Sequence, residues 1–477
     1  MDPLILLALG LAAVLGGILV LRLHPFLALV AAGLLVATLT PETGLRSYAA
    51  TKRMSAEATD KLVGETIGRR VANALGSTAA KVGILIALAA IIGKCLLESG
   101  AADRIVRGFI SAFGEARAGL AFGLSGFLLG IPVFFDTVFF LMIPLAKSLA
   151  LRTGKHYCLY ILAIIAGGSI SHSLVPPTPG PLLVAGELGV DIGRMIMVGI
   201  VIGIFVSASG YIYAVWFDKR FNIGVRETET GQLDELKKLA DRDTKDLPGL
   251  FISLCPILLP ILFVAVGTLV NSSAGKTFTA EWHPVILDTI RTLGDKIVAL
   301  AFGAAIAMVI LIRQKAQSLK DTMDSIPPAL KDAGLIILIT SAGGAFGGIL
   351  QQTGIGPRLQ EVTGGMAIGL LPLAWFITAV VRVAQGSATV AMITAVGIVG
   401  GMADAGNLGY HPVYIAIAIG CGSKMLPWFN DSGFWVICKM SGFTEKETLQ
   451  SFTPLLSVMG IVGLIITMIL AKVWPMI

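Results

Sequence analysis

Charged residues are scarce in this chain of 477 residues. They make up 14% of the sequence, whereas hydrophobic residues make up 55% and the mean hydropathy is +0.84. Soluble domains contain about 25% charged residues, so this composition excludes a soluble fold. Apolar runs long enough to cross ~30 Å of hydrocarbon recur along the chain, without the polar and apolar alternation of a membrane barrel. The sequence therefore predicts an all-α polytopic membrane protein.

Signatures of metal, redox and nucleotide chemistry are also missing. The five cysteines form no CxxC pair, the five histidines form no HExxH motif, and no GxxxxGK[ST] loop occurs. These absences argue against a disulfide framework, a zinc site, a zinc protease and an ATP-driven pump. We expect no metal and no other cofactor. The net charge of +6 is small for this length and gives no sign of a nucleic-acid partner.

Ten full membrane spans are predicted from apolar length and helix breakers. The first follows Met-Asp-Pro rather than a basic segment, so it is expected to be a retained span and not a signal peptide. The spans lie near residues 4–21, 25–40, 79–97, 157–190, 192–216, 250–270, 295–312, 333–353, 411–440 and 453–474.

Four apolar segments are interrupted. The stretches 118–150 and 367–402 are each too long for one straight helix and contain GIPVFFDT and RVAQGSAT, so each is predicted to be a re-entrant hairpin. The spans 157–190 and 411–440 contain SHSLVPPTPGP and KMLPWFNDSG. Proline blocks the continuation of a helix, so both spans are predicted to unwind at membrane depth. Unwound backbone is tolerated there only against protein or water.

Basic residues in short loops set the predicted orientation. The loop 217–247 holds seven Lys or Arg residues and the loop 313–331 holds four, whereas 271–294 holds two. The first two loops are assigned to the cytoplasm, which places both termini outside. The segment 41–81 then also lies outside, and its seven basic residues conflict with that placement.

The two halves of the chain resemble each other. GKCLLESG at 93–100 aligns with GGILQQTG at 347–354, and Gly168-Ser169 aligns with Gly422-Ser423 at the same spacing. Each half has about five spans and one hairpin, and an odd number of spans inverts the second copy. The sequence thus predicts an inverted-topology repeat.

The repeat divides the chain into a first half at 1–216, a cytoplasmic linker at 217–249 and a second half at 250–477. Paired interruptions at corresponding positions point to a transporter binding site near the bilayer midplane. A half-helix that begins inside the membrane presents free N–H groups and the positive end of its dipole, which suit an anion.

Polar residues in the four breaks are therefore the candidates for substrate binding. They are Asp136, Thr137, Ser171, His172, Thr178, Arg382, Gly386, Ser387, Thr389, Asn430, Asp431 and Ser432. Lys424 lies in the same breaks. Three of these residues, Asp136, Asp431 and His172, are candidates for carrying a coupled proton. The structural alternative for single residues is that Asp431 caps a half-helix and that Arg382 or Lys424 snorkels.

The interrupted segments also resemble a known family. GIPVFFDTVFFLMIPL, SHSLVPPTPGP, RVAQGSATVAMITA and FNDSGFW are similar to signatures of the gluconate permease family, and the similarity runs from about Leu4 to Leu470. The resemblance implies a proton symporter of gluconate and related sugar acids in the inner membrane, with D-serine carriers as a branch of the family. It also implies membership of the ion transporter superfamily, a homodimer, and an elevator-type movement of the hairpin-bearing domain.

Three departures from the family pattern lie in the predicted site. Asp136 stands where many relatives have Glu, Thr178 where PPxPGP usually has His, and KMLPWF where a His often precedes Asn430 by two residues. These departures bear on which substrate is taken.

We expect a proton-coupled symporter of a small hydroxycarboxylate, gluconate first. Its partners would be that organic anion, protons and the lipid bilayer. The alternative with the same fold is a permease for D-serine or another small polar amino acid. An ion channel or a membrane-embedded enzyme is the alternative from another class, but a channel does not need the inverted repeat and no nucleophile with its base is recognisable. Sodium coupling stays open, because unwound carbonyls beside Asn and Ser also suit Na⁺.

Overall fold

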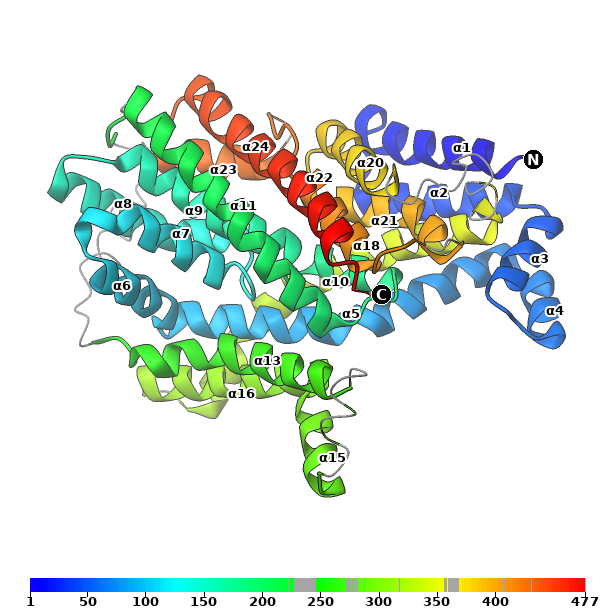
Figure 1. Cartoon of the computed structure of the whole chain (residues 1–477), viewed down its shortest axis with the longest axis horizontal. Helices are drawn as coiled ribbons and strands as arrows, with labels where there is room; N and C mark the ends of the chain where they lie inside the picture. Colours follow the sequence, from blue (N-terminus) through cyan, green and yellow to red (C-terminus); the bar gives the residue numbers. More distant parts are fainter. Residues whose placement is uncertain are drawn as a thin grey trace.

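Every regular element that the computed structural model describes is a helix (Figure 1). The described residues are 1–221, 223–226, 246–271, 276, 279, 282–316, 318–355, 358, 369–405, 408–429 and 431–476. Within them, seven helical segments are long and apolar enough to cross a membrane, or eight if a bent pair near the N-terminus counts as one span. The all-α prediction is confirmed.

The N-terminal helices begin at prolines, whose fixed backbone angle suits the first turn. They are α1 (Pro3–Leu15), which continues into a short π-helix η1 (Gly16–Val20), and α2 (Pro25–Leu39). With 13 and 15 residues, α1 and α2 are shorter than the ~20 residues that a straight span requires. The count of ten full spans is therefore higher than the number of long helices in the structure.

The segment 41–81 is mostly helical. It contains α3 (Glu42–Thr51), α4 (Ala56–Gly64) and the start of α5 (Ile67–Glu98), so the span predicted from residue 79 begins 12 residues earlier. Arg70, one of the residues that interrupts the apolar run, is buried in α5 and donates a hydrogen bond to the carbonyl oxygen of Ala37 at 2.8 Å. A charged residue was thus packed inside the protein where the hydropathy pattern suggested a loop.

The other helices include three that were not predicted, α6, α15 and α17. The remaining elements of the first half are α6 (Ala101–Phe113), the 3₁₀ turn η2 (Glu115–Arg117), α7 (Ala118–Leu129), α8 (Phe135–Thr153), α9 (Tyr157–Leu174), α10 (Pro179–Glu187) and α11 (Ile192–Phe221). Those of the second half are α13 (Leu250–Asn271), α15 (Pro284–Leu293), α16 (Lys296–Lys315), α17 (Leu319–Ser325), α18 (Pro327–Gln352), α20 (Leu370–Gln385), α21 (Ala388–Ala405), α22 (Val413–Gly422), α23 (Ser432–Ser441) and α24 (Glu445–Val473). Most of the predicted linker at 217–249 lies outside the described residues.

All four interrupted segments are broken helices. The first hairpin segment is α7 and α8, and the second is α20 and α21. The two broken spans are α9 with α10 and α22 with α23. Gly386 ends α20 with a φ of 90°, a left-handed conformation that glycine adopts without strain, and α21 begins two residues later.

Corresponding helices of the two halves begin at a constant spacing. The helices α8, α10 and α11 start at Phe135, Pro179 and Ile192, and α21, α23 and α24 each start 253 residues after their counterpart, at Ala388, Ser432 and Glu445. The helices that follow the breaks thus occur in the same order in both halves, as the aligned sequence motifs predict. The inverted orientation of the two halves stays a prediction.

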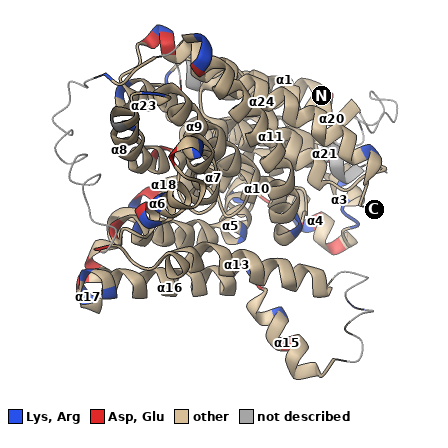
Figure 2. Cartoon of the chain, turned by 60° about the vertical axis from the view of Figure 1, so that its left-hand side comes forward, with Lys and Arg blue, Asp and Glu red and all other residues tan. Residues whose placement is uncertain are grey.

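The long helix α5 crosses the whole molecule (Figure 1). On one side of it lie α16 and α13, and on the other side lie α18, the interrupted segments, α11 and α24. Charged residues gather at helix ends and on short helices such as α6 and α17, while the long helices are mostly uncharged (Figure 2).

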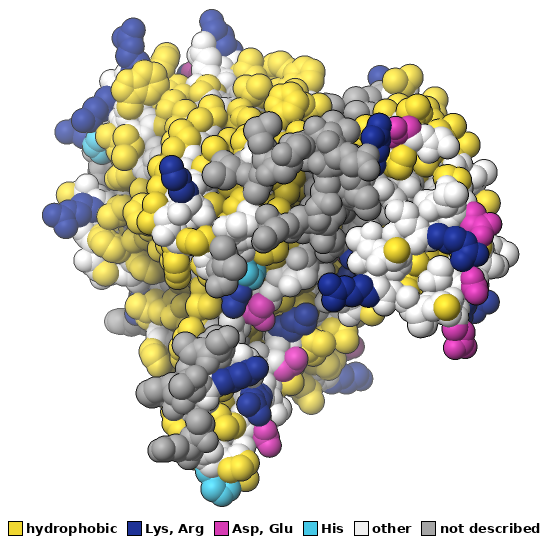
Figure 3. Space-filling model, turned by 45° about the vertical axis from the view of Figure 1, so that its right-hand side comes forward, with side chains coloured by type: hydrophobic (Ala, Val, Ile, Leu, Met, Phe, Trp, Pro, Cys, Tyr) yellow, Lys and Arg dark blue, Asp and Glu magenta, His cyan; other side chains and the backbone are white. Residues whose placement is uncertain are grey.

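Apolar side chains cover much of the surface in the space-filling view (Figure 3). Phe205 on α11, Phe251 on α13 and Ile469 on α24 are 57%, 81% and 54% exposed. Exposure of this kind suits helices that face lipid rather than water.

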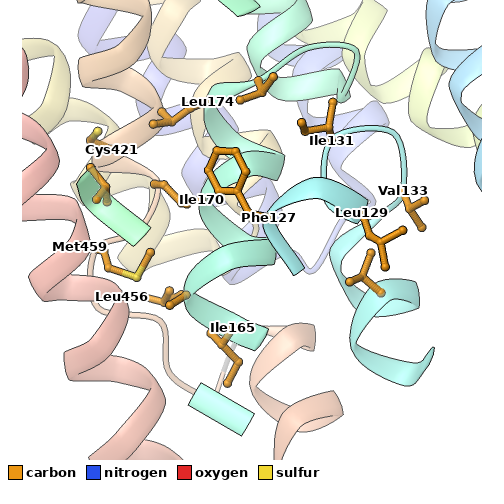
Figure 4. Close-up of a cluster of buried hydrophobic side chains, with 14 of the residues drawn as sticks. Phe127, Leu129, Ile131, Val133, Ile165, Ile170, Leu174, Cys421, Leu456 and Met459 are labelled. Carbon is orange, nitrogen blue, oxygen red and sulfur yellow. The ribbon is translucent and has the colours of Figure 1, made fainter. Parts of the chain in front are cut away.

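The core behind the breaks is tightly packed. A Cβ atom on Gly126 of α7 would lie 2.9 Å from the carbonyl oxygen of Ile164 on α9, so only glycine allows the two backbones to approach this closely. Beside this contact, Phe127 of α7 packs among apolar side chains from α9, α22 and α24 (Figure 4). The first break is therefore packed closely against buried neighbours.

Candidate functional site

A central cavity of about 450 Å³ lies where the four breaks meet. The first residues of α8, α10, α21 and α23 all line it. Four helix N-termini thus point their positive dipole ends toward one space, an arrangement that favours an anion. No side chain caps α8, so the N–H groups of its first turn have no partner within the helix.

One wall of the central cavity carries a buried ion pair. The guanidinium Nη2 of Arg382 donates to Oδ2 of Asp431, and the two residues are only 3% and 8% exposed. Oδ1 of Asp431 accepts a hydrogen bond from the backbone N–H of Gly433 at 2.9 Å and so caps α23. The capping role is thus present together with the ion pair, and Arg382 does not snorkel.

Three further ionisable side chains line the cavity, those of Lys424, Asp136 and His172. Lys424 is 4% exposed and lines the cavity, and its side-chain Nζ forms no hydrogen bond or ion pair with another described residue. Asp136 lies in the first turn of α8 and faces the same space. The ring of His172 lies 5.9 Å from the ring of Phe134, with an edge-on orientation.

Several buried polar atoms that border the cavity have no hydrogen-bond partner among the described residues. They are Ser169 Oγ, His172 Nδ1, Thr340 Oγ1, and Nε and Nη1 of Arg382. Leaving a buried donor or acceptor unpaired costs about 1–3 kcal/mol, and five of the ten such side-chain atoms among the described residues border this one cavity. Their position around one cavity indicates a site for a ligand with many hydroxyl or carboxylate oxygens.

Comparison with known proteins decides the family. Residues 2–473 match the family described as GntP family permease. The chain belongs to this family. It is 31% identical to the gluconate permease of Pseudomonas aeruginosa, over 95% of this chain and 94% of that protein. It is 33% identical to the inner membrane permease YgbN of Escherichia coli, over 84% of this chain and 88% of that protein.

The fold has a solved counterpart. The YdaH transporter of Alcanivorax borkumensis, described as having an unusual topology, is similar with a TM-score of 0.62 at 15% identity, over 85% of this chain and 89% of that chain. The predicted resemblance to the gluconate permease family is confirmed. The protein is a multi-pass membrane permease and not an enzyme.

The structure brings eight of the twelve predicted site residues of this GntP family permease into the central cavity. They are Asp136, Thr137, His172, Arg382, Ser387, Thr389, Asp431 and Ser432. The loop of the first hairpin and that of the second, expected to meet, line the same space. Asn430 lies outside the described residues. The part that these residues take in binding stays a prediction.

Three predicted residues do not line the cavity of the permease. The hydroxyl of Ser171 donates to the carbonyl oxygen of Gly168 at 3.3 Å, and that of Thr178 donates to the carbonyl oxygen of Val175 at 2.8 Å. Both hydroxyls thus pair with backbone carbonyl oxygens in α9 and in the turn that follows it. Gly386 caps the C-terminus of α20 and forms the turn to α21 with its left-handed backbone.

Other residues that line the cavity are hard to recognise from the sequence. Ile336, Ile339 and Thr340 come from α18, an uninterrupted helix in which no break marks a functional position. Ser169 lies one turn before the break of α9. Lys424 lies in a predicted break but is not among the twelve predicted binding residues. A cation in the middle of an apolar span is the signal that favours it.

Proposed function

We propose that this permease is a proton-coupled symporter of a small hydroxycarboxylate, gluconate or a related sugar acid, in the inner membrane. Its relative in Pseudomonas aeruginosa is named a gluconate permease, and the one in Escherichia coli an inner membrane permease. The observation that carries the proposal is the central cavity, where two buried cations and four helix N-termini accompany unpaired polar groups.

The cavity offers separate partners for the two parts of a sugar acid. The substrate carboxylate would lie against Lys424 and the N-terminus of α21, where Ser387 and Thr389 supply hydroxyls. Hydrogen bonds to a charged group contribute about 1.5–3 kcal/mol each. The substrate hydroxyls would pair with Ser169, Thr340 and the free nitrogens of Arg382.

The formal charges of the cavity support coupling to a proton. With Arg382 and Lys424 positive and both Asp136 and Asp431 ionised, the four side chains sum to zero, so an anion would add an uncompensated charge. Protonation of one carboxyl group leaves a charge of +1, which the anion cancels. Charge burial in a low-dielectric interior is costly, so anion and proton are expected to bind together.

Asp136 is the better placed of the two carboxyl groups to carry this proton. Asp431 already accepts from Arg382 and from the N–H of Gly433. No hydrogen bond or ion pair to another described residue holds Asp136, which borders the cavity directly. His172 is the competing carrier.

A binding and uptake screen tests the proposal. Thermal stability of the purified permease should rise with aldonates such as gluconate and not with D-serine, and uptake into proteoliposomes should follow a pH gradient. A response to D-serine alone would favour the amino-acid alternative, and a response to a sodium gradient alone would refute proton coupling. The homodimer and the elevator-type movement belong to the same proposal, and the mass of the purified particle tests the first of them.

A further inference from the structure

A second cavity adjoins the central one. It has a volume of about 200 Å³ and lies between α5, the start of α18 and the turn of the first hairpin, and we call it the α5–α18 cavity. Phe134 and Thr137 line both cavities, so these two side chains form the wall between them. The volume is far larger than the ~10–15 Å³ that one water molecule requires.

The α5–α18 cavity reaches the surface, and three polar side chains, those of Lys94, Thr137 and Asp332, interrupt its otherwise apolar lining. Lys94 and Asp332 line it; the side chain of Lys94 is 31% exposed and Asp332 is exposed. Nζ of Lys94 pairs with Oε1 of Glu98 at 2.7 Å, and Lys315 pairs with the other carboxylate oxygen at 3.5 Å. Water therefore has access from the mouth at Asp332 to the wall at Thr137.

We expect the wall between the cavities to discriminate by size. The ring of Phe134 packs edge-on against His172 in this wall, where it would stand in the way of a six-carbon acid. A proton needs only a chain of hydroxyls and water molecules. Thr137 supplies a hydroxyl in the wall, and the proposed carrier Asp136 is its neighbour in the first turn of α8.

We infer that the α5–α18 cavity is the aqueous route by which the coupled proton leaves Asp136, separate from the route of the substrate. The inference rests on the proposed function. The carboxyl group of Asp136 gives its proton to the Thr137 hydroxyl or to water, and the accepting group passes a proton to the water of the α5–α18 cavity. Asp136 becomes ionised and bulk water gains one proton near Asp332, so charge and atoms balance.

Two variants test this route without touching the central cavity. Ala329→Leu places an apolar side chain in the α5–α18 cavity, and Asp332→Asn removes the titratable group at its mouth. Their controls are Gly334→Leu, on the same helix where a Cβ meets no atom within 4 Å, and Asp324→Asn, an exposed acid outside the cavity. Gluconate is the probe in proteoliposomes containing a trapped pH dye.

Ala329→Leu should lose gluconate-driven internal acidification and net uptake while keeping wild-type exchange of labelled for unlabelled gluconate at equal pH. Asp332→Asn should change in the same direction, and both controls should behave as wild type. Wild-type acidification in both test variants would overturn the route. An equal loss of exchange and net uptake would also overturn it, by showing that the substrate uses this cavity. If wild type itself exchanges gluconate without acidification, proton coupling fails and the route fails with it.

Discussion

Arg382 near the end of α20 is ion-paired with Asp431, the capping residue of α23, so one buried contact joins the second hairpin segment to the second broken helix. Removing one partner of a buried pair leaves an uncompensated charge and costs about 3–5 kcal/mol. We expect Arg382→Gln and Asp431→Asn each to lower the thermal unfolding temperature in detergent and to weaken gluconate binding. The double variant should recover much of the stability but not the binding. Unchanged unfolding of either single variant would contradict this account of the pair.

Ser387 is expected both to cap the start of α21 and to bind the substrate. Its hydroxyl accepts from the N–H of Val390 at 3.3 Å, and it borders the central cavity. Ser387→Ala should weaken gluconate binding by about 0.5–1.5 kcal/mol, or about 1.5–3 kcal/mol if the hydroxyl meets the carboxylate, and should cost about 1 kcal/mol of stability as a lost cap. Calorimetric titration measures the first and thermal unfolding the second.

Thr394→Val is the matched control for Ser387→Ala. Thr394 lies on the same helix with a buried hydroxyl that has no partner among the described residues and does not border the central cavity. Its substitution should leave gluconate affinity unchanged. Unchanged affinity in folded Ser387→Ala protein would remove Ser387 from the site.

Thr340 on α18 is a predicted hydrogen-bond partner of the substrate hydroxyls. Thr340→Val should weaken gluconate binding by about 0.5–1.5 kcal/mol without lowering stability, since the hydroxyl has no partner in the protein. The neighbouring Ser341 has an equally unpaired buried hydroxyl outside the cavity lining. Ser341→Ala should therefore bind like wild type. Equal effects of both variants on the titrated affinity would argue for a packing effect instead.

The glycine contact between α7 and α9 should control the stability of the first hairpin. Gly126→Ala brings a Cβ to 2.9 Å from a backbone oxygen, and overpacking of this kind costs about 1–3 kcal/mol. Gly76 on α5 meets no atom within 4 Å, so Gly76→Ala should be neutral or stabilising by about 0.4–1 kcal/mol. Thermal unfolding compares the two variants, and equal unfolding temperatures would contradict the close approach.

The breaks were predictable because proline and glycine act locally. Pro179 is the first residue of α10, where proline is favoured, and Gly386 caps the end of α20, where glycine is favoured. Asp136 lies in the first turn of the helix that follows the turn predicted from GIPVFF. Polar groups near these turns were expected in one cavity because a membrane interior tolerates them only there. Most of them do lie in it.

What the sequence could not provide depends on packing between distant segments. The predicted span begins at residue 79, after Arg69 and Arg70, although both arginines lie in α5 and Arg70 is buried against Ala37. Thr340 looks like any small polar residue of an apolar helix until α18 is placed beside the breaks. Ser171 and Thr178 share the breaks with cavity residues, but their hydroxyls bond to their own backbone.

The most direct test is gluconate accumulation in proteoliposomes under an imposed pH gradient, acidic outside, without sodium. One proton carried with each anion supports about tenfold accumulation per pH unit. Wild type should accumulate gluconate, Asp136→Asn should not, and His172→Gln should still respond to the gradient. Accumulation by Asp136→Asn would contradict the assignment of the proton to Asp136, and accumulation by both Asp136→Asn and Asp431→Asn, or a wild type that responds to sodium and not to protons, would contradict the whole account.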